Sequence, residues 1–177
     1  MGVDSSTKGF AFAVINDRGE LIKYGKIDFA GGGVFNRLND AQKKLTAIKS
    51  EFPEVDLVVF EAATFIQNKK TVILMAMALG ATLPVFMDSD VTVKDIPPIT
   101  WQNYIGNKSF TKKEKEQVKE DNPGKSASWY QTELRRIRKD RTRKWVNNKF
   151  NVDSPVDDVT DAIAIAFVGW DQDNAKT

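Results

Sequence analysis

The sequence VDDVTDAIAIAF, at residues 156–167, decides how this chain can fold. Ser154 is a candidate N-cap in front of it, Pro155 suits the first helical position, and Asp157 follows three residues after the cap. From Ala162 onward nearly every residue is apolar, so a helix with this sequence should be buried on almost all sides. We therefore predict a helix that lies in the core of the domain.

Two carboxylates lie near the start of that helix. Asp158 and Asp161 are three residues apart and project from one face, where their like charges repel. Nothing nearby in the sequence neutralises them, and a divalent metal ion is the usual counter-charge for such a pair. The alternative is that both acids only favour the positive end of the helix dipole. Asp157 points about 100° away from Asp158, which favours a capping role, with metal ligation as the alternative.

Short apolar runs upstream predict five strands. The first three are joined by short turns, so they must be antiparallel neighbours. The fourth run ends in Glu61 and is typical of a buried parallel strand. The predicted strands are Gly2–Thr7, Phe10–Ile15, Leu21–Phe29, Asp56–Glu61 and a run from Val91 that stops near Pro97. The first strand has almost no apolar lead-in, which leaves open whether the start of the chain is trimmed.

Two helices are predicted between these strands. The first is Val34–Phe52, and its apolar stripe consists of Phe35, Leu38, Ala41, Leu45 and Ile48. The second covers Thr71–Phe86, which is apolar but short for a membrane span and therefore predicts a core helix.

Three more helices are predicted after the last strand. Thr100 is a candidate cap for a short one, and Thr111 with Glu114 forms a capping box for Lys112–Lys119. Ser126–Lys149 has the pattern of a long basic helix. Three antiparallel strands, then alternating helices and strands, then a helical end indicate one α/β domain of three layers.

The composition excludes several kinds of site. The chain has no cysteine and no histidine, which excludes disulfides, thiolate metal sites, a Ser-His-Asp triad and a His-rich zinc site. Any metal must then be held by oxygen atoms, which favours Mg²⁺ or Mn²⁺. We see no signal peptide and no apolar run near the roughly 18 residues of a membrane span. We therefore expect a cytoplasmic protein that does not bind membranes.

The charges are unevenly distributed. From Lys108 to Lys149 the chain has 14 Lys and Arg against 6 Asp and Glu, whereas the rest has 12 against 18. A basic segment beside an acidic body suits a nucleic-acid partner. The alternative is a solvated helix that is laced with salt bridges.

The acids should converge at one edge of the sheet. The first predicted strand ends near Asp4 and the fourth ends at Glu61. Open α/β sheets place their sites at the carboxyl ends of the strands, and the buried helix would bring Asp158 and Asp161 there. Four carboxylates in one small volume can hold two divalent cations roughly 3.5–4 Å apart, the arrangement used for phosphodiester hydrolysis.

Three motifs together resemble the RuvC family of Holliday-junction resolvases. They are GVDSST at Gly2–Thr7, VVFE at Val58–Glu61 and DVTDAIAIA at Asp158–Ala166. The resemblance implies an RNase H-like three-layer fold with a five-stranded mixed sheet of order 3-2-1-4-5. It also implies that residues 1–177 form one nuclease domain, with a basic helical insertion at about residues 122–149. The length of this insertion is more similar to phage or viral members, which implies a bacterial or phage-infected host cell.

The resemblance further implies a reaction and a set of residues. The family's metal-binding acids correspond to Asp4, Glu61, Asp158 and Asp161. They imply two Mg²⁺ ions, for which Mn²⁺ can substitute, and a homodimer that makes paired symmetric nicks in four-way DNA junctions and leaves 5′-phosphates. The apolar face of the helix beginning near Thr71 is a candidate for the dimer contact, with ordinary core packing as the alternative.

Further residues are predicted to contact DNA. Phe65 is similar in placement to an aromatic residue that touches junction bases in the family, with a core or dimer contact as the alternative. The remaining predicted DNA contacts are Asn68, Lys69, Lys112, Lys113, Lys115, Arg135, Arg136, Arg138, Lys139, Arg141, Arg143 and Lys144.

Three other functions stay open. The first is a nuclease that cuts flaps and forks as well as junctions. The second is a branched-DNA binding module without catalysis, for which four converging acids would be a poor choice. The third follows from Gly2–Thr7, which also resembles the first phosphate loop of sugar kinases and actin-like ATPases, although 177 residues cannot hold the two domains of that fold.

Overall fold

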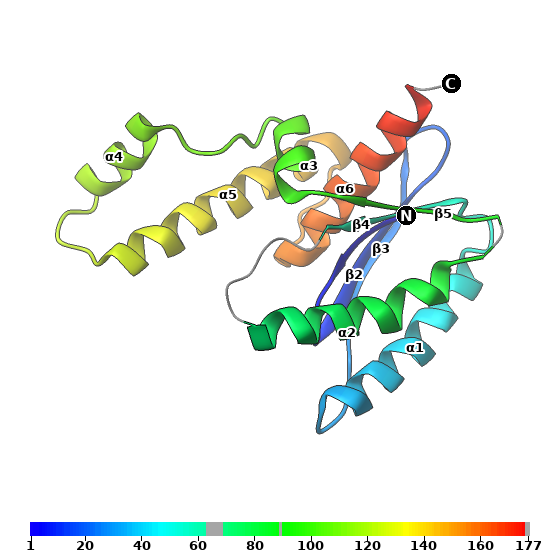
Figure 1. Cartoon of the computed structure of the whole chain (residues 1–177). Coiled ribbons are helices and arrows are strands. Elements are labelled where there is room, and N and C mark those ends of the chain that lie inside the picture. Colours follow the sequence, from blue (N-terminus) through cyan, green and yellow to red (C-terminus); the bar gives the residue numbers. More distant parts are fainter. Residues whose placement is uncertain (63–68, 89, 176–177) are drawn as a thin grey trace.

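The chain folds around a mixed sheet of five strands in the order β3-β2-β1-β4-β5 (Figure 1). The computed structural model describes residues 1–62, 69–88 and 90–175. The strands are β1 (Gly2–Ser5), β2 (Gly9–Ile15), β3 (Leu21–Asp28), β4 (Leu57–Glu61) and β5 (Thr92–Ile96). β2 pairs antiparallel with β1 and β3, whereas β4 pairs parallel with β1 and β5. The predicted strand order is confirmed.

Helices cover both faces of the sheet, as the three-layer prediction requires (Figure 1). α1 (Val34–Glu51) and α2 (Lys69–Phe86) pack together on one face. Their core contains the stacked rings of Phe10 and Phe86, which lie 5.8 Å apart between centroids. The other face is covered by α6 (Asp157–Asn174), α3 (Pro98–Tyr104) and part of α5 (Ala127–Phe150).

The helix α6 is the buried element that the sequence predicts. Nine of its residues, from Val159 to Gly169, are buried. It approaches β1 very closely at Gly2, where an added Cβ would lie 2.2 Å from the Ala166 nitrogen and 2.5 Å from the Ala162 oxygen. Only glycine allows the backbones of strand and helix to come this close.

Two predicted helix starts are wrong. α6 begins at Asp157 with Val156 as its N-cap, and the Ser154 Oγ accepts a hydrogen bond of 3.2 Å from the Val156 N–H. The serine therefore closes a local turn before the helix, a common alternative to capping for this residue type. α3 begins at Pro98, so Thr100 lies within the helix and does not cap it. A proline at the first turn already starts this helix.

One residue of the predicted stripe on α1 also departs from expectation. Leu38, Ala41 and Leu45 are buried as predicted, whereas Phe35 is 74% exposed. Phe35 lies in the first turn of the helix, so the core side of the helix starts one turn later.

The helix α2 is more exposed than the sequence predicts. Only Ala78, Thr82 and Phe86 are buried, and Ile73 is 61% exposed. Of the helices in the described ranges, α2 alone is long and apolar enough to cross a membrane by length and composition, and 17% of this 18-residue stretch is buried. The core-helix prediction is wrong, because α2 covers the sheet with a narrow face. The prediction that no apolar run approaches this length is also wrong, because the helix starts at Lys69 and reaches 18 residues.

The helices α4 (Lys112–Glu120) and α5 form a hairpin that extends away from the sheet (Figure 1). The capping box of Thr111 and Glu114 is present, and Ser126 caps α5 by accepting a hydrogen bond from the Trp129 N–H. The two helices are joined where Arg141 of α5 pairs with Glu114 at 2.9 Å. Both helix starts were predicted from the sequence.

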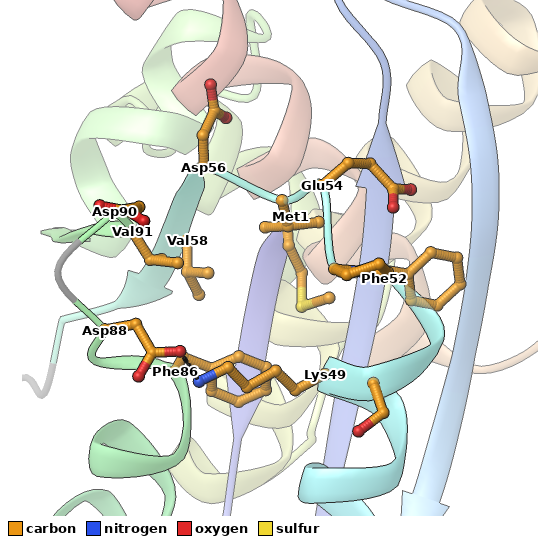
Figure 2. Close-up of a pocket in the computed structure, with 13 residues that line it drawn as sticks. Met1, Lys49, Phe52, Glu54, Asp56, Val58, Phe86, Asp88, Asp90 and Val91 are labelled. Atoms are coloured by element: carbon orange, nitrogen blue, oxygen red, sulfur yellow. Dashed lines mark hydrogen bonds and ion pairs between the residues drawn. The ribbon is translucent and has the colours of Figure 1, made fainter.

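A cavity of about 440 Å³ lies where β1 and β4 begin, beside the loops that enter β4 and β5 (Figure 2). Met1, Phe52 and Phe86 provide apolar side chains to its lining. Its acidic residues, Glu54, Asp56, Asp88 and Asp90, are exposed. Lys49 also lines it and forms an ion pair with Asp88.

Candidate active site

The four predicted acids line one cavity of about 470 Å³ at the opposite end of β1 and β4. The parallel pairing of these strands aligns Val3 with Phe60, and the next residue on each strand is an acid, Asp4 on β1 and Glu61 on β4. The first turns of α6 bring Asp158 and Asp161 to the same cavity. The structure therefore places together four residues that are up to 157 positions apart in the sequence.

Three of the four carboxyl groups of this cavity, those of Asp4, Glu61 and Asp161, are held in an environment that disfavours their charge. Burial, together with the neighbouring charges of Glu61, Asp161 and Asp158, raises the pKa of Asp4 to about 8. Burial likewise raises the pKa of Asp161 to about 7 and raises that of Glu61. Such clustered, mutually repelling carboxyl groups in a cleft are typical of functional sites.

Two lysines from distant parts of the chain neutralise the acids of α6. The Lys26 Nζ lies 2.8 Å from an Asp158 oxygen. The Lys139 Nζ lies 3.4 Å from Asp157, 4.0 Å from Asp158 and 3.8 Å from Asp161. No residue close in the sequence neutralises these acids, but the fold brings two lysines to them from distant positions.

Asp157 belongs to this ionic network. Its carboxylate accepts a hydrogen bond of 2.7 Å from Arg143 as well as facing Lys139. It makes no side-chain cap bond to α6, and it is not among the residues that line the acidic cavity. The predicted capping role is therefore wrong, because the side chain turns towards α5.

The donor set fits a hard divalent cation. All the candidate ligands are carboxylate oxygens, which Mg²⁺ and Mn²⁺ prefer. As the side chains stand, however, no group of three or more acidic residues within the described ranges is arranged to hold a metal ion. Lys139 contacts two of the four acids, so the present arrangement is one of ion pairs.

The structure adds Trp101, which the sequence did not indicate as a site residue. This side chain of α3 is fully buried, and its indole N–H donates a hydrogen bond of 3.0 Å to the Glu61 carboxylate. A donor of this kind fixes the orientation of a carboxylate that could bind a metal. In the sequence, Trp101 was only an aromatic residue in a predicted short helix, and such a residue cannot be told from an ordinary core residue.

The residues predicted to contact DNA fall into three groups. Arg135, Arg138 and Lys139 line the acidic cavity itself. A second group is engaged in ion pairs: Arg136 with Glu133 and Asp140, Arg141 with Glu114, and Arg143 with Asp140 and Asp157. A third group is exposed and comprises Lys69, Lys112, Lys113, Lys115 and Lys144, of which Lys112 also lies 4.0 Å from Glu116. Phe65 and Asn68 lie outside the described residues.

The arrangement of sheet and acids defines the class of fold. A mixed sheet of order 3-2-1-4-5, with a buried C-terminal helix across β1, is the RNase H-like fold that the motifs predicted. No protein-family model and no curated protein matches the sequence. The fold class therefore rests on solved structures.

Those structures are Holliday-junction resolvases. RuvC of Thermus thermophilus in complex with a Holliday-junction substrate matches with a TM-score of 0.67 and 14% identity over 94% of this chain and 88% of that one. Another Thermus thermophilus RuvC structure matches with a TM-score of 0.66 and 14% identity over 98% and 95% of the two chains. The yeast mitochondrial resolvase Ydc2 matches with a TM-score of 0.52 and 15% identity over 99% and 78%. The chain thus has the RuvC-type fold across nearly its whole length.

Proposed function

We propose that this protein is a Mg²⁺-dependent endonuclease that resolves four-way DNA junctions. The observation that carries the proposal is the cavity in which Asp4, Glu61, Asp158 and Asp161 face the basic residues of α5. A site built of four acids would repel DNA, whereas acids neutralised by cations and flanked by arginines suit a phosphodiester. The fold shared with junction resolvases supports the same conclusion.

The residues of the cavity would have different roles in the reaction. The four acids would hold two Mg²⁺ ions, which when bound activate a water molecule and stabilise the leaving 3′ oxygen. Trp101 holds the Glu61 carboxylate in one orientation. Arg135 and Arg138 line the same cavity and would bind the phosphate beside the one that is cut. The product strand would carry a 5′-phosphate.

The hairpin of α4 and α5 would bind a DNA arm. It extends away from the sheet (Figure 1). Its helix α4 carries exposed lysines, including Lys112, Lys113 and Lys115. Each lysine that neutralises a phosphate should add nearly one to the slope of log K against log salt.

Two nicks require two sites, and we propose a homodimer. The face of α2 that points away from the sheet exposes Val72 and Ile73, with Met75 half-buried beside them. An exposed apolar face of this kind marks an interaction surface. Sedimentation of the protein at micromolar concentration should show a dimer, and Ile73→Glu should convert it to a monomer. A wild-type monomer under these conditions would contradict the proposal.

The function is tested by mapping the nicks. A labelled four-way junction and a linear duplex of the same sequence are incubated with Mg²⁺ or EDTA. We expect symmetric nicks in opposite strands of the junction only, and none with EDTA. Tight binding of the junction without any cleavage would instead indicate a binding module.

A broader branched-DNA nuclease is the second candidate. The length of the α4–α5 hairpin favours it, because an arm that binds duplex can hold the stem of a flap or fork as well as one arm of a junction. Cleavage of flaps and forks at rates similar to the junction would favour this candidate over strict junction resolution.

A further inference from the structure

Lys139 has an unusual position for a lysine of a DNA-binding helix. Its ammonium group lies within 4.0 Å of three carboxylates, those of Asp157, Asp158 and Asp161. Its side chain is 24% exposed and that of Asp161 is 14% exposed, so the group is shielded from water more than a surface ion pair. The positive charge of Lys139 offsets part of the burial-driven rise in the pKa of Asp4, Glu61 and Asp161, so it acts on the whole cavity.

A chain of ion pairs along α5 holds this lysine in place. Asp157 faces the Lys139 ammonium at 3.4 Å and is itself bound by Arg143 at 2.7 Å. Arg143 also pairs with Asp140 at 3.2 Å, and Asp140 pairs with Arg136 at 2.7 Å. Asp157 is therefore fixed by a network of ion pairs that lies outside the cavity. Its carboxylate in turn holds the Lys139 ammonium beside Asp158 and Asp161.

Lys26 pairs with Asp158 alone, whereas Lys139 also faces Asp161. We propose that Lys139 is a built-in counter-ion of the acidic cavity, and that a divalent cation binds between Asp158 and Asp161 only when the Lys139 ammonium moves out. In this proposal Asp157 is a positioning residue that sets the metal affinity by holding Lys139. This inference rests on the proposed function, because it takes Asp158 and Asp161 as metal ligands.

The exchange has a consequence for the order of binding. A lysine side chain is long and flexible, and its ammonium group binds phosphate well. Once a DNA phosphate lies beside the cavity, Lys139 can pair with it and leave the carboxylates to the metal. DNA and metal should therefore each raise the affinity for the other, because such coupling is reciprocal.

The decisive measurement is Mn²⁺ binding without DNA, followed by electron paramagnetic resonance and calorimetry. Lys139→Met removes the competing charge, and we expect the Mn²⁺ affinity to rise about tenfold. Lys144→Met is the matched control, because it removes a lysine from an exposed position of the same helix, and it should change the affinity less than about twofold. An unchanged or lower affinity in Lys139→Met would overturn the proposal.

Asp157→Asn provides an independent test. If Asp157 positions Lys139, this variant loosens the lysine, and the Mn²⁺ affinity should rise. If Asp157 is itself a metal ligand, the affinity should fall, which would contradict the proposal. Melting temperatures in EDTA show that the variants are folded, and Lys139→Arg should restore a low Mn²⁺ affinity because it retains the charge.

The same titrations separate this inference from the proposed function. Wild-type protein that binds no Mn²⁺, or binds it equally well as Asp4→Asn, would contradict both. Wild-type protein that binds Mn²⁺ through the acids but is unaffected by Lys139→Met would contradict this inference alone. With junction DNA present, the wild-type affinity for Mn²⁺ should rise, and that of Lys139→Met should change less.

Discussion

Two cavities of nearly equal size lie at opposite ends of β1 and β4, and each is lined by four acids. The one at the carboxyl ends measures about 470 Å³ and the one at the amino ends about 440 Å³ (Figure 2). In the first, burial raises the pKa of Asp4, Glu61 and Asp161. In the second, the acids are exposed and stand around an apolar lining. The number of acids and the volume are alike, so what separates the two cavities is burial.

The difference follows from the elements that carry the acids. Asp4 and Glu61 are strand residues, and Asp158 and Asp161 begin a buried helix, so their backbone is fixed and partly enclosed. The acids of the amino-end cavity lie on the loops that enter β4 and β5. One of them, Asp88, forms an ion pair with Lys49 of α1. Groups on regular elements hold their geometry better than groups on loops.

The largest expected effect is on catalysis. Asp4→Asn keeps the shape of the side chain but removes one of the buried carboxylates, so junction cleavage should fall about a thousandfold or more. Asp56→Asn makes the same change in the other cavity and should leave the rate within about twofold. Single-turnover cleavage of a labelled junction measures both. Full activity of Asp4→Asn would remove the distinction between the cavities and the proposed function with it.

A smaller effect is expected from the indole that orients Glu61. Trp101→Phe retains an aromatic ring but loses the N–H donor, and the Mg²⁺ concentration for half-maximal cleavage should rise about tenfold. Trp170→Phe is the control, because its indole donates at 3.3 Å to the exposed Asp17 carbonyl and Trp170 does not line the acidic cavity. If both variants behave like wild type, Glu61 is held by packing and not by this hydrogen bond.

The raised pKa values predict a pH effect on stability without metal. Unfolded aspartates ionise near pH 4, whereas Asp4 in the folded chain ionises near pH 8 and Asp161 near pH 7. The folded state binds more protons at these two groups, so its stability should fall as the pH rises from about 4 to about 7. Above about pH 6 the buried Met1 ammonium, whose pKa burial lowers to about 6, contributes in the opposite direction, so little further change is expected from pH 7 to pH 8. In EDTA at pH 8, Asp4→Asn should therefore melt about 2–4 °C above wild type, which corresponds to about 1 kcal/mol.

The control and the metal dependence make this prediction specific. Asp90→Asn should not change the pH profile of the melting temperature, because Asp90 is exposed. Mg²⁺ should reverse the destabilisation of wild type, since it stabilises the ionised carboxylates of the native state. A wild-type melting temperature in EDTA that rises from pH 5 to pH 8 would show that the acids are not mutually repelling.

The smallest effect concerns the cations of α5. Arg136 pairs with Glu133 and Asp140, whereas Lys144 is exposed, and no ion pair of Lys144 is found among the described residues. Lys144→Ala should lower the salt slope of junction binding by nearly one, and Arg136→Ala should leave it almost unchanged. Equal slopes for the two variants would show that ion pairs within α5 open when DNA binds.

Much of the fold could be predicted because its signals are local. The five strands, the capping box of Thr111 and Glu114 and the start of the long basic helix near Ser126 all depend on residues within a few positions of one another. The start of α6 could not be predicted, because Ser154 can either cap a helix or close a turn, and the choice depends on tertiary packing. The exposure of α2 was missed because an apolar composition does not say how much of a helix the sheet can cover.

The site was predicted in part for the same reason. The acids stand at the ends of recognisable strands and at the start of the last helix, so their convergence followed from the topology. The partners of the acids did not follow, because Lys26 is 132 residues from Asp158 and Trp101 is 40 residues from Glu61. Neither residue belongs to a motif, and only the folded chain brings them to the site.

The contact at Gly2 makes one position outside the site important for its geometry. The backbone of α6 rests on β1 at this glycine, two residues before Asp4 and beside Ala162 and Ala166. A single methyl group in Gly2→Ala would act as a spacer between helix and strand, and it would move Asp158 and Asp161 together relative to Asp4. The distance from Asp4 to Asp158 and Asp161 thus depends on the lack of a side chain at Gly2. A substitution at this glycine should therefore reduce activity although every carboxylate is intact.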